Sequence, residues 1–285
     1  MNKPLTLSII IPVYNEEHRI RACLDAIAEQ ELKPKEVIVV DNNCSDRSAK
    51  IAASYSFVKV VTEKEQGLIF SRNRGFNIAT GDILARIDAD SILSANWSKV
   101  LLNTFENNEI VGVTGPGYSL LLPRIRKPMT LMWSRMYFLW THMFYRAPVL
   151  WGANMAIRRD AWQGIKTKVC LNDQTVHEDQ DISLLLQANG GKLRYNNQLR
   201  FTSYSQAYHY FPKLVQYTVM RHTTRNHHRE IGSLDRMVKD IPLPVSFLFY
   251  SIAWIVLFIF FFASFLAWPI DAIMKARGKQ EEWLS

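Results

Sequence analysis

The stretch GDILARIDADS, residues 81–91, joins an apolar run to a pair of acids and is the best guide to the fold of the first half of the chain. The run covers residues 83–87, and Asp88 and Asp90 follow where it ends. Carboxylates that leave water are costly unless they are paired or hold a cation. The stretch therefore fits either a strand that ends in an ordinary polar turn or a strand that carries a cation site.

Residues 1–110 alternate between apolar runs typical of strands and segments whose apolar residues recur at helical spacing. This alternation predicts an α/β fold in which helices flank a parallel sheet. Such sheets bind ligands beyond the carboxyl ends of their strands, so polar residues there should converge on one crevice. The predicted strands are 5–13, 36–41, 58–62 and 82–90, the predicted helices are 16–30, 45–56 and 67–81, and the converging residues are Asn15, Asp41, Asp88 and Asp90.

The chain of 285 residues has a formal net charge of +8, so we expect acidic partners such as phosphorylated small molecules or anionic lipid. Nucleic acid is not an expected partner, because the basic residues gather beside an apolar C-terminal segment and not over the first domain. Cys23, Cys44 and Cys170 are scattered and have no C-x-x-C spacing. Neither a disulfide framework nor a zinc site is indicated.

The apolar C-terminal segment, residues 243–268, contains no charged side chain and is rich in phenylalanine. A membrane-spanning helix needs about 20 apolar residues. We therefore predict one transmembrane helix here, followed by a short polar tail over residues 269–285. The excess of Lys and Arg before the segment places the N-terminal domain on the cytoplasmic side of the cell membrane, as a single-pass protein in contact with membrane lipid.

A basic amphipathic segment, residues 124–147, lies inside a longer stretch, 110–159, that lacks acidic residues. Its methionine and aromatic residues recur at helical spacing, and arginine occupies other positions. A helix of this kind either packs in the core or lies at a bilayer interface. Both interpretations remain open.

Five motifs follow one another along the chain: SIIIPVYNEE (8–17), VVDNNCSD (39–46), SRNRGFNIATGDILARIDADS (71–91), GANMAIRR (152–159) and HEDQDISLLLQANGG (177–191). In this order they resemble the motifs of family 2 glycosyltransferases, which are inverting, use nucleotide sugars and have the GT-A fold. The resemblance covers about residues 5–230 and implies a Rossmann-like, mixed and mostly parallel sheet. With the predicted membrane helix, the chain looks like the membrane-attached members. Processive relatives carry Q-x-x-R-W near residues 221–225, which this chain lacks, so a non-processive enzyme is implied.

The resemblance implies transfer of a sugar from a nucleotide-diphosphate sugar to a lipid-linked, membrane-proximal or other glycan acceptor. Asp88 and Asp90 match the D-x-D motif, which assigns Asp90 to a metal ion, with Asp88 helping or contacting the ribose. Mn²⁺ and Mg²⁺ are hard ions that prefer carboxylate oxygens and substrate phosphates, so either fits. His209 is a further candidate metal ligand.

Other residues match the family positions that bind the nucleotide sugar. Asp41 corresponds to a carboxylate that reads the base or the ribose, and Arg72 to a residue near the nucleotide. Gly152 permits close backbone approach, and Asn154 is expected to bind sugar hydroxyls. Arg221 and Arg225 lie one helical turn apart and suit a diphosphate or lipid phosphate, or else an anionic lipid surface. The first nucleotide-binding loop is matched by Pro12, Tyr14, Asn15 and Glu16.

Asp179 corresponds to the family's catalytic base, with Glu178 supporting it. A carboxylate within reach of the acceptor hydroxyl can take its proton. Acids also belong in the first turn of a helix because they complement its dipole, so a purely structural role is the alternative. An ionised lipid-phosphate acceptor needs little base, and Asp179 would then orient it.

The domain organisation follows from these assignments. Residues 1–235 form the GT-A domain, with a nucleotide-binding half at 1–110 and an acceptor half at 111–235. Two other functions would fit parts of this pattern. A sugar nucleotidyltransferase would need a glycine-rich phosphate loop after the first strand, and the PVYNEEHR stretch (12–19) has no glycine. A catalytically silent binding or scaffold subunit of an envelope-glycan complex would not need Asp88, Asp90 and Asp179.

Overall fold

The computed structural model describes residues 4–119, 134, 138–139, 141, 148–172, 175–203, 219–221 and 223–228. These residues all belong to one compact unit, formed by residues 1–205 and 219–238. The predicted membrane helix, the polar tail, His209 and most of segment 124–147 lie outside the described residues. Among the helices of the described part, none is long and apolar enough to cross a membrane.

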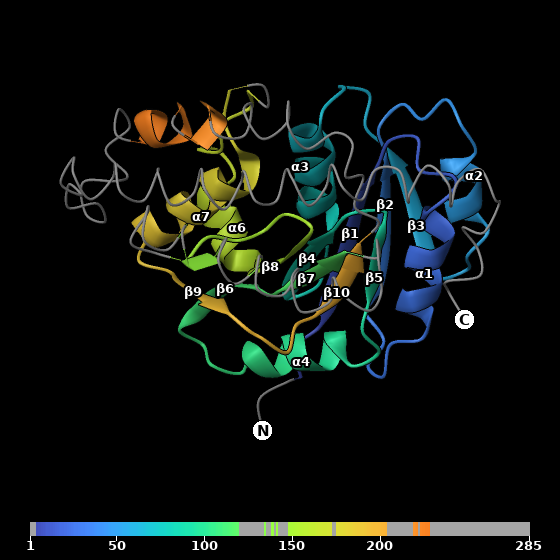
Figure 1. The fold of residues 1–285 in the computed structure, drawn as a ribbon, viewed down its shortest axis with the longest axis horizontal. Coiled ribbons are helices and arrows are strands. Elements are labelled where there is room, and N and C mark those ends of the chain that lie inside the picture. Colours follow the sequence, from blue (N-terminus) through green and yellow to red (C-terminus); the bar gives the residue numbers. More distant parts are fainter. Residues whose placement is uncertain are drawn as a thin grey trace, which may run out of the picture. The chain divides into compact units, whose positions relative to one another are not determined.

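A mixed, mostly parallel sheet forms the centre of this unit, as predicted (Figure 1). Its strands run in the order β3-β2-β1-β4-β8-β6-β9. The pairs β3·β2, β2·β1, β1·β4 and β6·β9 are parallel, and β8 runs antiparallel between β4 and β6. The strands are β1 Leu7–Val13, β2 Glu36–Asp41, β3 Val58–Thr62, β4 Ile83–Ile87, β6 Ile110–Thr114, β8 Asn154–Arg158 and β9 Lys192–Tyr195.

A short second sheet borders the carboxyl end of β4. It consists of β5 (Ser91–Leu93), β10 (Phe201–Ser203) and β7 (Gly117–Ser119), in the order β5-β10-β7. Because β5 begins one residue after Asp90, this sheet fixes the path of the chain that leaves the two acids.

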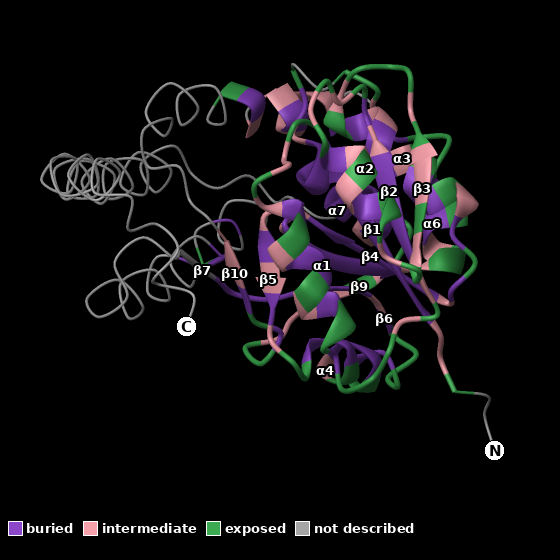
Figure 2. Ribbon diagram, turned by 90° about the vertical axis from the view of Figure 1, so that its right-hand side faces the viewer, coloured by how far each residue is buried: buried purple, intermediate pink, exposed green. Residues whose placement is uncertain are grey.

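Helices cover both faces of the central sheet, so its inner strands β1 and β4 are buried on both sides, whereas the edge strands β3 and β9 are partly exposed (Figure 2). Residues of α1, α2 and α4 pack in one hydrophobic cluster, and residues of α3, α6 and α7 pack in the other. The helices are α1 Ile20–Ala28, α2 Ser48–Ala53, α3 Leu68–Ile78, α4 Trp97–Thr104, α6 Arg159–Ile165 and α7 Glu178–Ala188.

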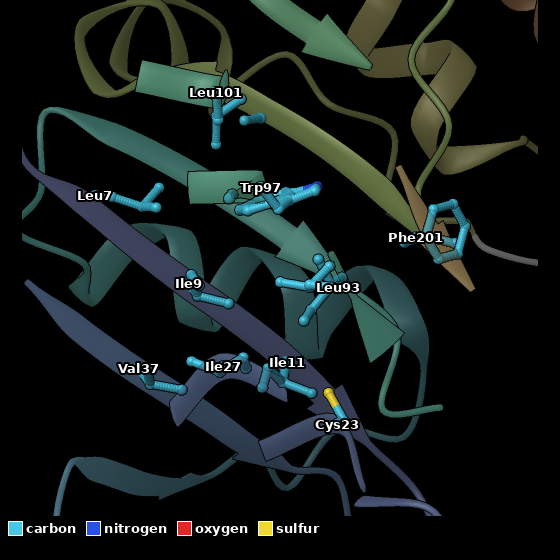
Figure 3. Packing of buried hydrophobic residues seen from close by; sticks show 14 of the residues in the cluster. Leu7, Ile9, Ile11, Cys23, Ile27, Val37, Leu93, Trp97, Leu101 and Phe201 are labelled. Atoms are coloured by element: carbon cyan, nitrogen blue, oxygen red, sulfur yellow. The ribbon is translucent and has the colours of Figure 1, made fainter. Parts of the chain in front are cut away.

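Alternating side chains of β1 divide between the two clusters. Ile9 and Ile11 pack with Trp97 in the first cluster (Figure 3). Ile10 packs with Phe76 in the second cluster. All five are fully buried. Burying a side chain of this size contributes about 1.5–3 kcal/mol, and strands covered on both faces show continuous apolar runs rather than alternation. The core therefore fixes the strand order that positions the site.

Candidate active site

The carboxyl ends of β1, β2 and β4 meet at one edge of the sheet, as predicted. In the pairing of β1 with β2, Val13 lies opposite Asp41, so the loops that follow the two strands leave together. Asn15 has a positive φ of 54° and accepts a hydrogen bond from the Ser45 backbone N–H at 2.8 Å. The Asp41 carboxylate accepts one from the backbone N–H of Cys44 at 2.9 Å. The Asn15 bond ties the two loops together, and the Asp41 bond shapes the turn that follows β2.

The loop after β1 presents some of its predicted nucleotide-binding residues to solvent. Tyr14 is 55% exposed, which leaves its ring available to a ligand. The Glu16 carboxylate pairs with Arg19 at 2.8 Å. Pro12 is buried within β1 and therefore shapes the strand without offering a surface to the nucleotide.

Asp88 and Asp90 lie together directly after β4. The side chain of Asp88 is 40% exposed. Asp90 is half-buried, and its Oδ2 accepts a hydrogen bond from Ser203 Oγ at 3.1 Å. Burial, followed by the charges of Asp88 and Glu16, raises the pKa of Asp90 to about 6. A divalent cation would relieve this repulsion, and carboxylate oxygens are the ligands that Mn²⁺ and Mg²⁺ prefer. The carboxylate oxygens of Asp88 and Asp90 therefore fit such an ion.

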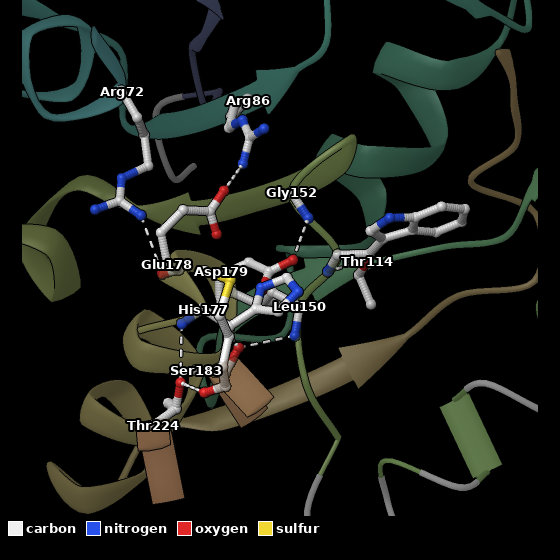
Figure 4. Close-up of polar contacts among 12 residues, drawn as sticks. Arg72, Arg86, Thr114, Leu150, Gly152, His177, Glu178, Asp179, Ser183 and Thr224 are labelled. Atoms are coloured by element: carbon white, nitrogen blue, oxygen red, sulfur yellow. Dashed lines mark hydrogen bonds and ion pairs between the residues drawn. The ribbon is translucent and has the colours of Figure 1, made fainter. Parts of the chain in front are cut away.

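Arg86 joins Asp88 to Glu178 at the start of α7, and Figure 4 shows its contact with Glu178. It is buried on β4, and its Nη2 lies 2.6 Å from Asp88 Oδ1. Its Nη1 forms an ion pair with Glu178 Oε1 at the start of α7. Burial alone would lower the pKa of Arg86, but Asp88 and Glu178 raise it, so the guanidinium stays charged.

Arg86 is not among the site residues predicted from the sequence. The available signal was an arginine inside an otherwise apolar strand, two residues before the first acid. Gly152 accommodates this side chain, because a Cβ at position 152 would overlap Arg86 Nη1. Gly152 thus permits a close approach to its backbone, as predicted, and the group that approaches is the Arg86 guanidinium.

The first turn of α7 carries three buried acids, Glu178, Asp179 and Asp181, of which the first two face Arg86 and Gly152. Asp179 Oδ2 accepts a hydrogen bond from the Gly152 backbone N–H at 3.0 Å, and Oδ1 lies 2.7 Å from His177 Nδ1. Burial would raise the pKa of Asp179, but His177, the Gly152 amide and Arg86 together lower it to about 2. Burial and the Asp179 charge raise the pKa of Glu178. Asp179 is therefore the ionised partner.

His177 is the second residue that the sequence analysis left without a role, although it begins the HEDQD motif. It lies immediately before α7 in extended conformation, and its backbone N–H donates to Thr224 Oγ1 at 2.8 Å. Burial would lower its pKa, but Asp179 raises it.

Donor atoms of His177, Glu178 and Asp179 lie within 4.8 Å of one another, a spacing that a metal ion could use. These atoms already face the Arg86 guanidinium and the Gly152 N–H. A cation there would have to displace positive groups, so the cluster fits an ion-pair network better than a metal site.

Two residues predicted to bind the ligand are fully buried. Asn154 Oδ1 accepts a hydrogen bond from Trp97 Nε1 at 2.9 Å, and its Nδ2 donates to the Leu199 carbonyl at 2.8 Å, so its amide holds the core. Arg72 donates to the Glu178 backbone carbonyl at 3.0 Å and thereby supports α7. Their predicted contacts with the sugar and the nucleotide remain predictions.

Residues 219–221 and 223–228 are helical and pack beside the start of α7. His228 Nε2 lies 2.9 Å from Asp181 Oδ1, and both side chains are fully buried. The positive charge of Arg221 acts on His177, which places this arginine near the acid turn. Arg225 is partly buried on the same helical stretch.

Comparisons with known proteins agree with this geometry. The model of glycosyl transferase family 2 matches residues 8–165, more than half of the chain. The putative glycosyltransferase EpsH of Bacillus subtilis is 33% identical over 34% of this chain and 30% of its own length. The cholesterol galactosyltransferase of Borreliella burgdorferi is 32% identical over 37% of this chain and 31% of its own. The alignments thus span about a third of each curated relative.

Two solved structures share the fold. The mannosyltransferase PcManGT from Pyrobaculum calidifontis, in complex with GDP-Man and Mn2+, has a TM-score of 0.63 at 17% identity, over 99% of this chain and 82% of its own. S. aureus TarS 1-349, in complex with UDP-GlcNAc, has a TM-score of 0.55 at 18% identity, over 71% and 59%. These findings do not favour a nucleotidyltransferase or a silent subunit. By its sequence match and its fold, the chain belongs to glycosyl transferase family 2.

Proposed function

We propose that this protein is a membrane-attached, metal-dependent, inverting and non-processive glycosyltransferase. It moves a hexose from a nucleotide-diphosphate sugar to a lipid-linked or membrane-proximal glycan acceptor. Residues 1–235 form the catalytic domain on the cytoplasmic side, and residues 243–268 anchor it in the membrane. The name of the Borreliella relative, a cholesterol galactosyltransferase, supports an acceptor in the membrane.

The observation that carries the proposal is the Arg86 bridge. One buried guanidinium contacts Asp88 and Glu178, so the acids after β4 and the acids of α7 belong to a single site. Inversion requires the leaving group and the base on opposite faces of the anomeric carbon. In the proposed arrangement the diphosphate leaves toward Asp88 and Asp90, and the acceptor approaches from the side of α7.

Asp88 and Asp90 would hold Mn²⁺ or Mg²⁺, which supplies positive charge against the departing diphosphate. The solved neighbour with GDP-Man and Mn2+ supports this ion for a related fold. Tyr14, directly after β1, and Asp41, at the end of β2, would bind the base and the ribose. Asp179 belongs to the acceptor side, where the first turn of α7 receives the proton of a hydroxyl acceptor.

A donor screen tests the proposal. Full-length protein in detergent is incubated with Mn²⁺ and a panel of nucleotide sugars, beginning with UDP-N-acetylglucosamine and GDP-mannose, and release of nucleoside diphosphate is measured. We expect release with one donor class, loss of release in Asp90→Ala, and full loss after chelation. Unchanged turnover in excess EDTA would contradict the metal-dependent mechanism.

A second variant tests the acceptor side. Asp179→Asn should keep donor binding and stop transfer to a hydroxyl acceptor, because the ionised partner at α7 is lost. Retained transfer in this variant would indicate a phosphate acceptor, which needs no base. Membrane attachment is tested separately by sedimentation: the full chain should stay with membranes after a high-salt wash, and release into the supernatant would contradict the anchor.

A further inference from the structure

We infer that Ser203 is a positioning residue for the cation site and that its hydroxyl fixes the orientation of the Asp90 carboxylate. The inference rests on the proposed function in one respect, namely that Asp88 and Asp90 hold a divalent cation. It adds a residue from the acceptor half of the chain. The family match covers residues 8–165, so Ser203 lies beyond it.

The backbone places Asp90 in a tight turn, and a distant side chain orients its carboxylate. The turn between β4 and β5 is closed by the backbone N–H of Ser91, which donates to the Asp88 carbonyl at 3.0 Å. Ser203 Oγ donates to Asp90 Oδ2 at 3.1 Å, across 113 residues of sequence. Among the residues that the structure describes, Asp90 Oδ1 has no hydrogen-bond partner, so this oxygen is left for a cation.

The short second sheet holds Ser203 beside this turn. In the antiparallel pair of β10 with β5, Ser203 lies opposite Ser91, the residue that follows Asp90. Phe201 lies on the same face of β10, since side chains alternate along a strand. Its buried ring packs against that of Trp151, with centroids 5.3 Å apart, and belongs to the hydrophobic cluster of Figure 3. The core therefore turns this face of β10, and with it the Ser203 hydroxyl, toward the acids.

Asp88 and Asp90 are thus oriented in the same way by two different donors. Arg86 Nη2 lies 2.6 Å from Asp88 Oδ1, and Ser203 Oγ lies 3.1 Å from Asp90 Oδ2. Each contact engages one oxygen of a carboxylate, and the other oxygen remains for a metal ion. Groups that orient metal ligands in this way contribute strongly to affinity, and their loss typically weakens metal binding by about 10–100-fold.

A neutral hydroxyl suits this position because the site already contains a buried cation, the Arg86 guanidinium. A second positive side chain beside Asp90 would repel a divalent ion. The Ser203 hydroxyl orients the carboxylate and leaves its negative charge to the ion. Local sequence gives no signal for this role, because the hydrogen bond depends on the pairing of β10 with β5.

The test measures Mn²⁺ binding to the full-length protein in detergent, with no donor present, from the EPR signal of the free ion. Ser203→Ala removes the hydroxyl and keeps the backbone. We expect its dissociation constant for Mn²⁺ to rise by about 10–100-fold. Ser203→Thr retains a hydroxyl donor and should restore the wild-type affinity.

Thr202→Val is the matched control, because it removes a hydroxyl from the adjacent residue of β10, whose side chain points to the other face of the strand. It should bind Mn²⁺ as the wild type does. Melting temperatures in EDTA identify any variant that fails to fold. If Ser203→Ala fails, Ser203→Cys replaces it: a thiol is a weak donor, so Mn²⁺ binding should still weaken.

An activity measurement adds a readout that a general loss of structure would not give. With a donor that the screen shows to be active, Ser203→Ala should need more Mn²⁺ for its half-maximal rate, by the same factor as its dissociation constant rises. Its rate at saturating Mn²⁺ should equal that of the wild type. Three results overturn the inference: Mn²⁺ binding is unchanged in Ser203→Ala, Ser203→Thr binds as weakly as Ser203→Ala, or the saturating rate falls while the Mn²⁺ requirement stays the same.

These measurements separate the inference from the proposed function. Mn²⁺ binding that depends on Ser203, with no nucleoside-diphosphate release from any donor, supports the inference and refutes glycosyl transfer. Mn²⁺-dependent release, with equal Mn²⁺ affinity in the wild type and Ser203→Ala, overturns the inference alone. A wild type that binds no Mn²⁺ overturns the cation site on which both rest.

Discussion

The charge of Asp90 is predicted to destabilise the metal-free protein, so Asp90→Asn should make that form more stable while abolishing metal binding. The pKa of Asp90 rises from 3.8 to about 6 in the fold. At 1.36 kcal/mol per unit, the shift corresponds to at most about 3 kcal/mol. As the pH rises from about 4 to 6, the unfolded chain loses this proton before the folded chain does, and the wild type loses stability. The Asp90→Asn variant does not lose this stability, because its amide carries no charge.

Thermal unfolding of the full-length protein in EDTA measures the effect. At pH 7.5 we expect the melting temperature of Asp90→Asn to exceed that of the wild type by up to about 10 °C, since 1 kcal/mol moves a domain of this size by about 2–4 °C. The difference should shrink as the pH falls from 6 to 4.5. Added Mn²⁺ should stabilise the wild type and leave the variant unchanged.

Asp88→Asn is the contrasting control. Asp88 pairs with buried Arg86 at 2.6 Å, so its loss removes a favourable partner and should lower the melting temperature in EDTA. A metal-free Asp90→Asn protein less stable than the wild type at pH 7.5, or equal stabilisation of both by Mn²⁺, would refute the electrostatic account of the site.

The remaining predictions concern the groups around this pair. Arg86→Met leaves a buried carboxylate on α7 without its cation and should cost about 3–5 kcal/mol in the free energy of unfolding measured with urea; a loss below about 1 kcal/mol would show that the bridge does not form. Gly152→Ala displaces Arg86 and should abolish nucleoside-diphosphate release. Gly164→Ala, whose Cβ meets its nearest atom at 3.8 Å, should leave this release intact. Equal activity of the two variants would contradict the close approach of Arg86 to Gly152. His228→Leu removes the imidazole that contacts buried Asp181 and should lower the free energy of unfolding by about 3 kcal/mol. An unchanged denaturation midpoint would show that this contact does not stabilise the fold.

The sequence predicted the first half of the fold well because local pattern determined it. The apolar runs before Tyr14, Asn42 and Asp88 are strands β1, β2 and β4, and their ends meet at one edge of the sheet. Parallel strands joined by helices leave few other arrangements. The acids after β4 could therefore be placed at the site from the sequence.

The second half of the site depended on tertiary structure. Strand β8 runs antiparallel beside β4, with Met155 opposite Arg86 and Asn154 opposite Ile87. No local pattern specifies this pairing, which turns Asn154 into the core and brings Gly152 against Arg86.

By itself, the sequence determined the family and the polar residues that follow strands β1, β2 and β4. These include the pair Asp88 and Asp90. Only the tertiary structure decided which charges neutralise one another: Arg86 with Glu178, and His177 with Asp179. The reason is physical. A buried charge needs a partner at contact distance, and the fold supplies that partner from a distant segment that local sequence patterns do not identify.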